Sequence, residues 1–193
     1  MSTATPVSIC SNALLMLGDA PISSLDDNSD RARLASNIWP TARDYVLRRH
    51  PWNCAIKRES LNPDAQAPAF DFAYQYTLPG DLLRVLSVGL DTERLPYKVE
   101  GRKILCDVKP LLVRYVYRNE DPSTWDSALV WGMTQVMRAI FAYGITQSTS
   151  LEQLVETVMR DVLRQARATD GLEDEPDALD DSPLLQARYR GVR

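Results

Sequence analysis

The sequence holds few of the residues from which metal centres and disulfide frameworks are built. Its 193 residues include one histidine and three cysteines. The cysteines, Cys10, Cys54 and Cys106, are widely spaced and form no C-x-x-C pair, so neither a disulfide framework nor a zinc site is expected. The pattern is typical of small buried side chains in a reducing compartment. We therefore expect a protein that needs no metal and no cofactor.

Long apolar runs and a surplus of positive charge are also lacking. No run approaches the ~20 residues that a membrane-spanning helix needs, and residues 1–10 lack the basic and apolar regions of a signal peptide. We expect a protein that is made in the cytosol and does not contact a membrane. The formal net charge is -4, whereas proteins that grip nucleic acid usually carry a basic surplus or stripe. The charge disfavours a DNA-binding protein, but it leaves room for a local basic patch.

The motifs of common catalytic sites are missing too. The sequence contains no G-x-S-x-G, P-loop, G-x-G-x-x-G or H-E-x-x-H. His50 has no candidate nucleophile beside it, and its neighbours Pro51 and Trp52 indicate a packed structural corner where a helix turns into a sheet. The acidic cluster at residues 26–30 lacks the turn glycine of a calcium loop, and helix capping explains it better. We expect a chain that is not an enzyme.

Apolar spacing predicts two helices in the first part of the chain. Residues 6–17 follow a Thr5 cap, residues 30–49 follow a cap at Ser29 or the next residue, and both carry apolar side chains at three- and four-residue spacing. Pro40 is expected to kink the second helix. Three arginines near its end are expected on its solvent-exposed face and in its last turn: Arg43, Arg48 and Arg49. Its inner face is expected to carry Leu34, Ile38, Tyr45 and Val46.

Strand patterns replace the helical period in residues 55–119, including a hairpin that turns near Gly101. Helical spacing returns in residues 121–143, where Gly132 indicates a close helix crossing. A fourth helix is expected to begin at Ser150. Together these patterns predict an α+β fold that is mainly α: a four-helix bundle with a small antiparallel β-domain inserted between helices 2 and 3.

We divide the chain into helices 1 and 2 (1–54), a β-rich insertion (55–119), helices 3 and 4 (120–170) and an extended C-terminal region (171–193). The first part of that last region is acidic and too poor in apolar residues to bury a core, so we expect a mobile tether. Residues 182–193 are apolar and basic, which indicates either a docking arm or an unimportant terminus. The expected anchors of the arm are Leu184, Leu185, Arg188, Tyr189 and Arg190.

Five segments of the sequence, taken together and in chain order, resemble a known protein family. No single motif among them is specific enough alone. They are SICSNALLMLGDAPISSLDDNSDRAR, NIWPTARDYVLRRHPWNCAIKR with its Pro-Trp corner, YTLPGDLLRVL, DPSTWDSALVWGM and SPLLQARYRG. In this order they resemble the tail tubular protein A family, the head-to-tail adaptors of short-tailed phages. Residues 61–72 and 87–110 carry no signature of the family.

The resemblance implies a virion structural protein at the head–tail interface, present in the host cytoplasm during assembly. It implies a homo-oligomeric ring of about twelve copies beneath the portal protein, with the tail nozzle on the far side and residues 182–193 docked on the portal. An acidic ring would repel the DNA that passes through it and bind none specifically. Two alternatives remain at this point: a nucleic-acid-binding regulator that uses the arginines near residue 48, and an enzyme with an unrecognised site.

Overall fold

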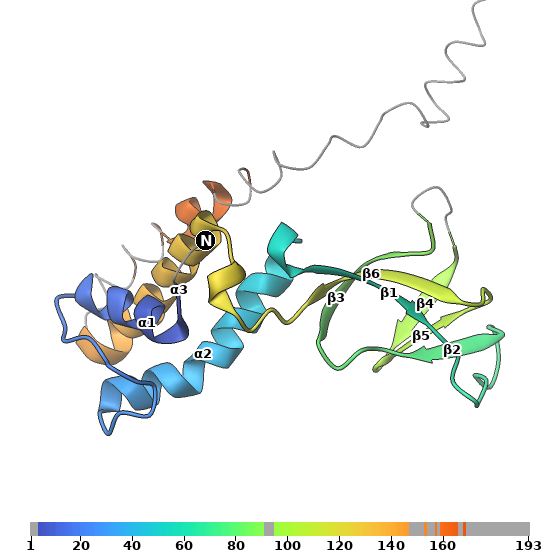
Figure 1. The fold of residues 1–193 in the computed structure, drawn as a ribbon, viewed down its shortest axis with the longest axis horizontal. Helices are drawn as coiled ribbons and strands as arrows, with labels where there is room; N and C mark the ends of the chain where they lie inside the picture. The colour runs from blue at the N-terminus through green and yellow to red at the C-terminus, as the bar shows by residue number, and fades with distance from the viewer. Residues whose placement is uncertain are drawn as a thin grey trace, which may run out of the picture.

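The computed structural model describes residues 4–90 and 95–146, and farther along the chain residues 153, 157, 159–165 and 168. These residues form an elongated molecule with helices at one end and strands at the other (Figure 1). We call the two ends the helical lobe and the β lobe. All strands lie between the second and third helices in chain order, so the chain crosses between the lobes twice.

The first helix, α1 (Pro6–Leu15), begins where the sequence predicts. Ser8 N–H donates to Thr5 Oγ1 at 3.1 Å, and Thr5 N–H donates to Ser8 Oγ at 2.9 Å. This reciprocal cap satisfies two backbone donors that have no partner inside the helix. The helix ends two residues earlier than predicted, in a turn where Gly18 has φ +76 and Asp19 N–H donates to the Leu14 carbonyl at 3.1 Å.

The second helix, α2 (Asp30–Arg49), has the predicted bounds at both ends, with Ser29 as its cap and Pro40 inside it. Its predicted inner face is wrong at Tyr45, which is 54% exposed, whereas Val46 is buried as expected. Three of the buried side chains of α2 are alanines, which let the helix approach the core closely. A prediction of the inner face from the spacing of large apolar residues does not include them. The buried residues of α2 are Ala32, Ala35, Trp39, Ala42, Arg43, Val46 and Leu47.

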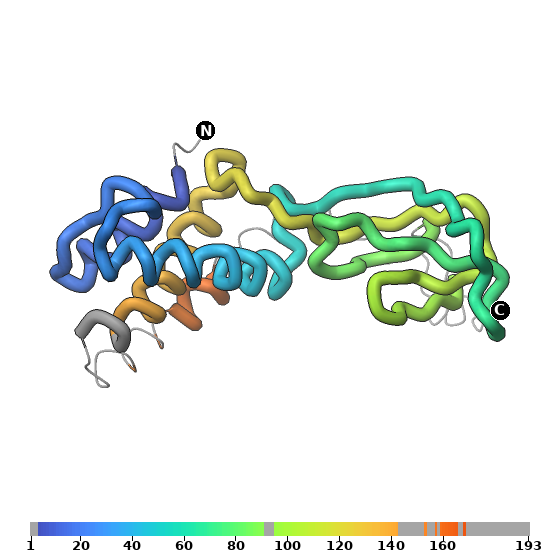
Figure 2. Tube along the Cα trace, turned by 90° about the horizontal axis from the view of Figure 1, so that it is seen from below, coloured from blue at the N-terminus to red at the C-terminus, as the bar shows by residue number. Residues whose placement is uncertain are grey.

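The β lobe consists of two three-stranded antiparallel sheets. In spatial order, the first contains β1 (Ile56–Leu61), β6 (Leu111–Tyr117) and β3 (Leu82–Val88). The second contains β2 (Tyr74–Thr77), β5 (Lys103–Cys106) and β4 (Tyr97–Glu100). The predicted turn at Gly101 joins β4 to β5, and its φ is +58. Figure 2 shows the two lobes joined end to end.

Each lobe has its own hydrophobic core. The core of the helical lobe includes Ile9, Leu14, Leu47, Trp52, Leu129, Met133 and Phe141. The core of the β lobe includes Tyr76, Ile104, Leu111, Val113 and Tyr115. Leu83 and Val116 lie on strands but pack in the helical core. The ends of β3 and β6 nearest the helices are therefore held by the other lobe.

The prediction of a mainly α four-helix bundle with a small β insertion is wrong. The described fold is α+β, with six strands in two sheets beside the helices. The physical reason is the second core, which buries the aromatic rings of Tyr76 and Tyr115 and makes the strands a full structural lobe. Strand patterns in residues 55–119 predict these strands one by one, but they do not show that the strands enclose a core of their own.

The third helix, α3 (Ser127–Thr146), follows a 3-10 turn at Pro122–Thr124 and packs against both α1 and α2. Gly132 does mark a close approach, because a Cβ at this position would lie 3.0 Å from Leu163 Cδ2. Residues 159–165 are helical, and the rest of the predicted fourth helix lies mostly outside the described residues. None of the described helices is both long and apolar enough to cross a membrane.

Candidate interaction surfaces

The predicted structural corner lies where the chain first leaves the helical lobe. His50 ends α2 in extended conformation, and Pro51 follows it. Trp52 is 1% exposed, donates its indole N–H to the Val46 carbonyl at 3.1 Å and meets the His50 ring edge-on at 4.7 Å. The five predicted arm residues lie outside the described residues: Leu184, Leu185, Arg188, Tyr189 and Arg190.

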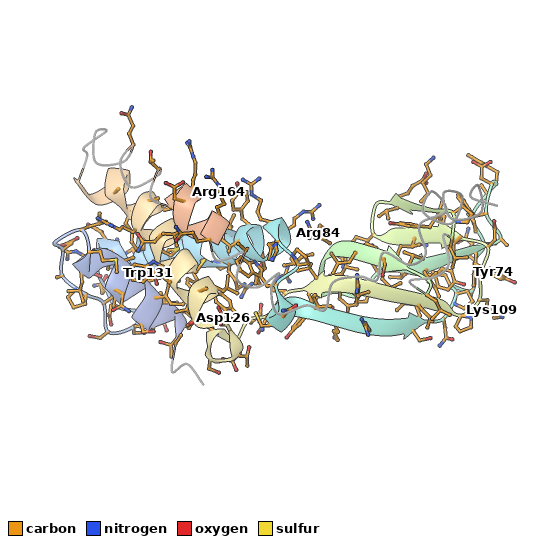
Figure 3. The ribbon with its side chains drawn as sticks, turned by 90° about the horizontal axis from the view of Figure 1, so that it is seen from above. Tyr74, Arg84, Lys109, Asp126, Trp131 and Arg164 are labelled. Carbon is orange, nitrogen blue, oxygen red and sulfur yellow. The ribbon has the colours of Figure 1, made fainter. Side chains whose placement is uncertain are left out.

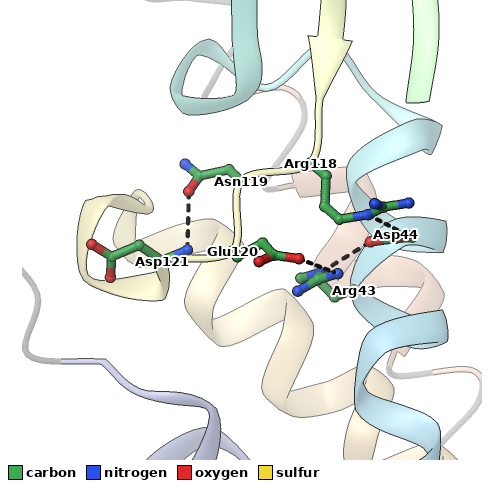
Figure 4. Close-up of polar contacts among 6 residues, drawn as sticks. All are labelled: Arg43, Asp44, Arg118, Asn119, Glu120 and Asp121. Atoms are coloured by element: carbon green, nitrogen blue, oxygen red, sulfur yellow. Dashed lines mark hydrogen bonds and ion pairs between the residues drawn. The ribbon is translucent and has the colours of Figure 1, made fainter. Parts of the chain in front are cut away.

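A cluster of charges, shown in Figure 4, braces the junction between the lobes. The Arg43 guanidinium contacts Asp44 Oδ1 at 2.9 Å and Glu120 Oε1 at 3.2 Å, and Arg118 Nε donates to the other Asp44 oxygen at 2.8 Å. The prediction that Arg43 is solvent-exposed is wrong, since the residue is only 8% exposed. It lies beneath the segment that leaves β6, and it joins α2 to that segment.

Asn119 ties the two crossings between the lobes together. Its amide Nδ2 donates to the Cys54 carbonyl at 2.8 Å and to Thr124 Oγ1 at 2.9 Å, while its Oδ1 accepts from the Asp121 N–H at 3.2 Å. The residue is 4% exposed. A buried amide with several partners fixes a single arrangement of the segments it joins. We conclude that the lobes are held in a defined mutual orientation.

The remaining arginines at the end of α2 also have partners in the protein. Arg48 donates to the Leu83 carbonyl of β3, and the Arg49 guanidinium lies 4.9 Å from the centre of the Tyr45 ring. Hydrogen bonding to a carbonyl and stacking on an aromatic ring are both favourable for a guanidinium. These side chains therefore support the junction and the surface of α2.

A largely apolar opening lies on the helical lobe, between α2, α3 and Met159. We call it the helical groove. Its volume is about 510 Å³. It is lined by Ile38, Thr41, Ala42, Tyr45, Val136, Ala139, Ile140 and Met159. Tyr45 stands at its rim with more than half of its surface in solvent. Exposed apolar patches of this kind mark contacts with other proteins or with ligands.

The β lobe carries its own exposed and charged side chains. Lys57 lies 2.9 Å from Asp81, and this hydrogen bond raises the pKa of the lysine. The Tyr115 hydroxyl donates to Glu59 Oε2 at 2.9 Å; burial, followed by that hydrogen bond, raises the pKa of Tyr115. Both shifts keep Lys57 charged and Tyr115 neutral near neutral pH. Figure 3 shows Tyr74 and Lys109 at the end of the β lobe farthest from the helices, and Trp131 on the helical lobe.

No group of three or more metal-binding side chains occurs within the described ranges. No protein-family model matches the chain, and a search of curated proteins also returns no match. Function must therefore be argued from the residues. Sequence reasoning missed the roles of Arg43 and Asn119, and the only available signal was the polar run that follows the last strand at residues 118–121.

Proposed function

We propose that this protein is a structural subunit of a phage head-to-tail adaptor, a ring that joins the portal to the tail and surrounds the DNA channel. The observation that carries the proposal is the helical groove, an open apolar surface on one side of the helical lobe. Each subunit of a ring must present such a surface to its neighbour. We infer the type of ring from the five segments that, in chain order, resemble the tail tubular protein A family.

The braced junction also supports this role. A ring passes force from head to tail only if each subunit keeps its shape. The contacts of Arg43 and Asn119 restrain both crossings between the lobes. We assign the contacts between neighbours to the helical groove, and docking on the portal to residues 182–193. A few aliphatic and aromatic anchors usually carry most of the energy of an interface, and the arm offers Leu184, Leu185 and Tyr189.

The partners of the α2 arginines favour the adaptor over a nucleic-acid-binding regulator. The regulator hypothesis needs Arg43, Arg48 and Arg49 to contact phosphate. Arg43 is buried against Asp44, and Arg48 is bonded to a β3 carbonyl. The net charge of -4 also suits a channel wall from which DNA is repelled. Under this proposal the adaptor contacts passing DNA without binding it specifically.

Co-sedimentation with portal-bearing heads of the same phage tests the proposal. We expect the full chain to attach in many copies per head. Truncation after Asp181 should abolish attachment and leave the thermal unfolding of the lobes unchanged, because a terminal arm contributes little to a core. If the full chain does not attach, the adaptor proposal fails. If the truncated chain attaches as well as the full chain, the assignment of the arm fails.

A substitution at the rim of the helical groove tests the contact between neighbours. Tyr45→Glu places a charge where the proposal puts an apolar contact, so it should lower the number of copies per head without unfolding the protein. Phe70→Glu is the matched control, since Phe70 is 75% exposed and lies in the β lobe. Equal occupancy for both variants would remove the groove from the interface.

A further inference from the structure

The side chains that line the helical groove restrict what can fill it. Six of the eight are apolar and none is charged; the two polar side chains are those of Thr41 and Tyr45, which both end in a hydroxyl. At the rim, the Arg49 guanidinium lies 4.9 Å from the centre of the Tyr45 ring and adds a positive charge. The groove therefore suits an apolar side chain with few polar atoms, and the charge of Arg49 disfavours a basic segment.

The C-terminal region of the chain is a poor occupant by this criterion. Residues 182–193 carry three arginines and no acidic residue, and residues 173–181 carry six carboxylates. Burying an unpaired charge in an apolar groove costs free energy. The proposed ring places a second copy of the chain beside each subunit, so we searched the helical lobe itself for a side chain that matches the groove.

Trp131 on α3 is that side chain. It is 50% exposed, and the other exposed large apolar residue of the described helical lobe outside the groove is Leu15, which is smaller. An indole combines a large apolar body with one N–H, which needs an acceptor when it is buried. The hydroxyls of Thr41 and Tyr45 can accept that hydrogen bond. The Met159 sulfur adds a favourable contact for an aromatic ring.

Trp131 and the groove lie on different faces of α3. Ile140 lines the groove and follows Trp131 by nine residues. At 3.6 residues per turn this is about two and a half turns, so the two side chains point in opposite directions from the helix. One copy therefore cannot place its own Trp131 in its own groove. A contact between Trp131 and a groove joins two different surfaces, and repeating such a contact gives a ring or a filament.

We propose that Trp131 of one copy fills the helical groove of the next copy, with its indole N–H donating to the hydroxyl of Thr41 or Tyr45. This inference rests on the proposed ring and identifies the side chain that holds neighbouring subunits together. Figure 3 shows Trp131 on the helical lobe, where the ring contact is assigned. Tryptophan is among the residues that most often carry the binding energy of an interface. Each copy supplies one tryptophan and one groove.

The occupancy of portal-bearing heads tests the contribution of Trp131. Trp131→Ala should raise the protein concentration needed for half occupancy about tenfold or more, because the loss of a central anchor costs at least that much affinity. Thermal unfolding of the free protein should stay unchanged, since the ring is half exposed. Phe70→Ala is the matched control, because it removes an exposed aromatic ring from the β lobe. Equal half-occupancy concentrations for the wild type and Trp131→Ala overturn the proposal.

Cross-linking tests which two surfaces meet. Ser127→Cys introduces an exposed thiol one turn before Trp131 on the same face of α3. Thr41→Cys introduces a thiol in the groove. The two variants are mixed, loaded on heads, treated with a short bismaleimide and separated on a denaturing gel. We expect a linked pair of chains that neither variant gives alone. No such pair, on heads that carry both variants, overturns the proposal.

Two further comparisons complete the test. Adding Trp131→Ala to the Ser127→Cys chain should remove the linked pair, whereas adding Phe70→Ala should leave it. A linked pair that persists without Trp131 would show that the surfaces meet through other side chains and would refute its role. Heads that carry the wild type in many copies, together with either negative result, refute this inference alone. Heads that bind no wild-type protein refute the adaptor proposal, and this inference falls with it.

Discussion

The indole N–H of Trp52 donates to the Val46 carbonyl at 3.1 Å, so the chain closes back on the last turns of α2 as it leaves the helical lobe. The ring is 1% exposed and lies in the helical core. Replacing a buried aromatic side chain with alanine costs about 3–5 kcal/mol. We therefore expect Trp52→Ala to lower the denaturant midpoint strongly or to prevent folding.

Trp131→Ala is the matched control for that experiment. Trp131 is 50% exposed on α3, so its removal forfeits little burial and should change the midpoint only slightly. Chemical denaturation followed by circular dichroism measures both variants. An unchanged midpoint for Trp52→Ala would mean that the corner contributes no core packing.

The charge cluster at Arg43 should contribute to stability through geometry as well as charge. Arg43→Met keeps the length of the side chain but removes the contacts to Asp44 and Glu120. Hydrogen bonds to charged groups contribute about 1.5–3 kcal/mol each when buried, and Glu120 is largely exposed. We therefore expect a total loss of about 1–3 kcal/mol. Arg33→Met on the exposed face of the same helix should cost much less.

Urea denaturation distinguishes the two arginines. A further variant, Arg43→Lys, should recover only part of the loss, because an ammonium group cannot reproduce the two divergent contacts of a guanidinium. Equal midpoints for Arg43→Met and Arg33→Met would show that the cluster in Figure 4 does not brace the junction.

The three cysteines should differ in reactivity toward iodoacetamide. Burial raises the pKa of the Cys10 thiol to about 12, and burial also raises that of Cys106. The thiolate is the reactive form, so both should be labelled slowly in the folded protein near pH 8. Cys54 is partly exposed and should be labelled first. Mass spectrometry of tryptic peptides gives the order, and early labelling of Cys10 would contradict the described packing of α1.

Acid should weaken the contact between Asp19 and Arg31. The hydrogen bond from Arg31, at 2.6 Å, holds the pKa of Asp19 below its ordinary value of 3.8. A lowered folded-state pKa gives stability that is present above the unfolded-state value and is lost as pH falls through the folded-state value. Asp19→Asn should therefore lose less stability than the wild type between neutral pH and the region below 3.8. Urea midpoints across this range measure the difference, and parallel curves would contradict it.

Local features of the fold could be predicted from the sequence, whereas pairings across long separations could not. The caps at Thr5 and Ser29 and the turn at Gly101 depend on neighbouring residues alone. The pairing of β1 with β6 joins segments far apart in the chain, and no local pattern specifies such a partner. The second core was underestimated for this reason.

The candidate sites divide in the same way. His50, Pro51 and Trp52 form a recognisable corner because they are adjacent in sequence. The burial of Arg43 depends on Glu120, which approaches only after the β lobe has folded. Arg58 and Arg114 likewise become neighbours only through the register of β1 with β6. Neither relationship leaves a periodic signal in the sequence.

Imaging of portal-bearing heads before and after incubation with the purified protein tests the central claim most directly. The adaptor proposal predicts an additional ring beneath the portal, closed around the channel, with about twelve copies in contact through their helical lobes. Heads that gain no density, together with a protein that stays monomeric in light scattering at the same concentration, would contradict it.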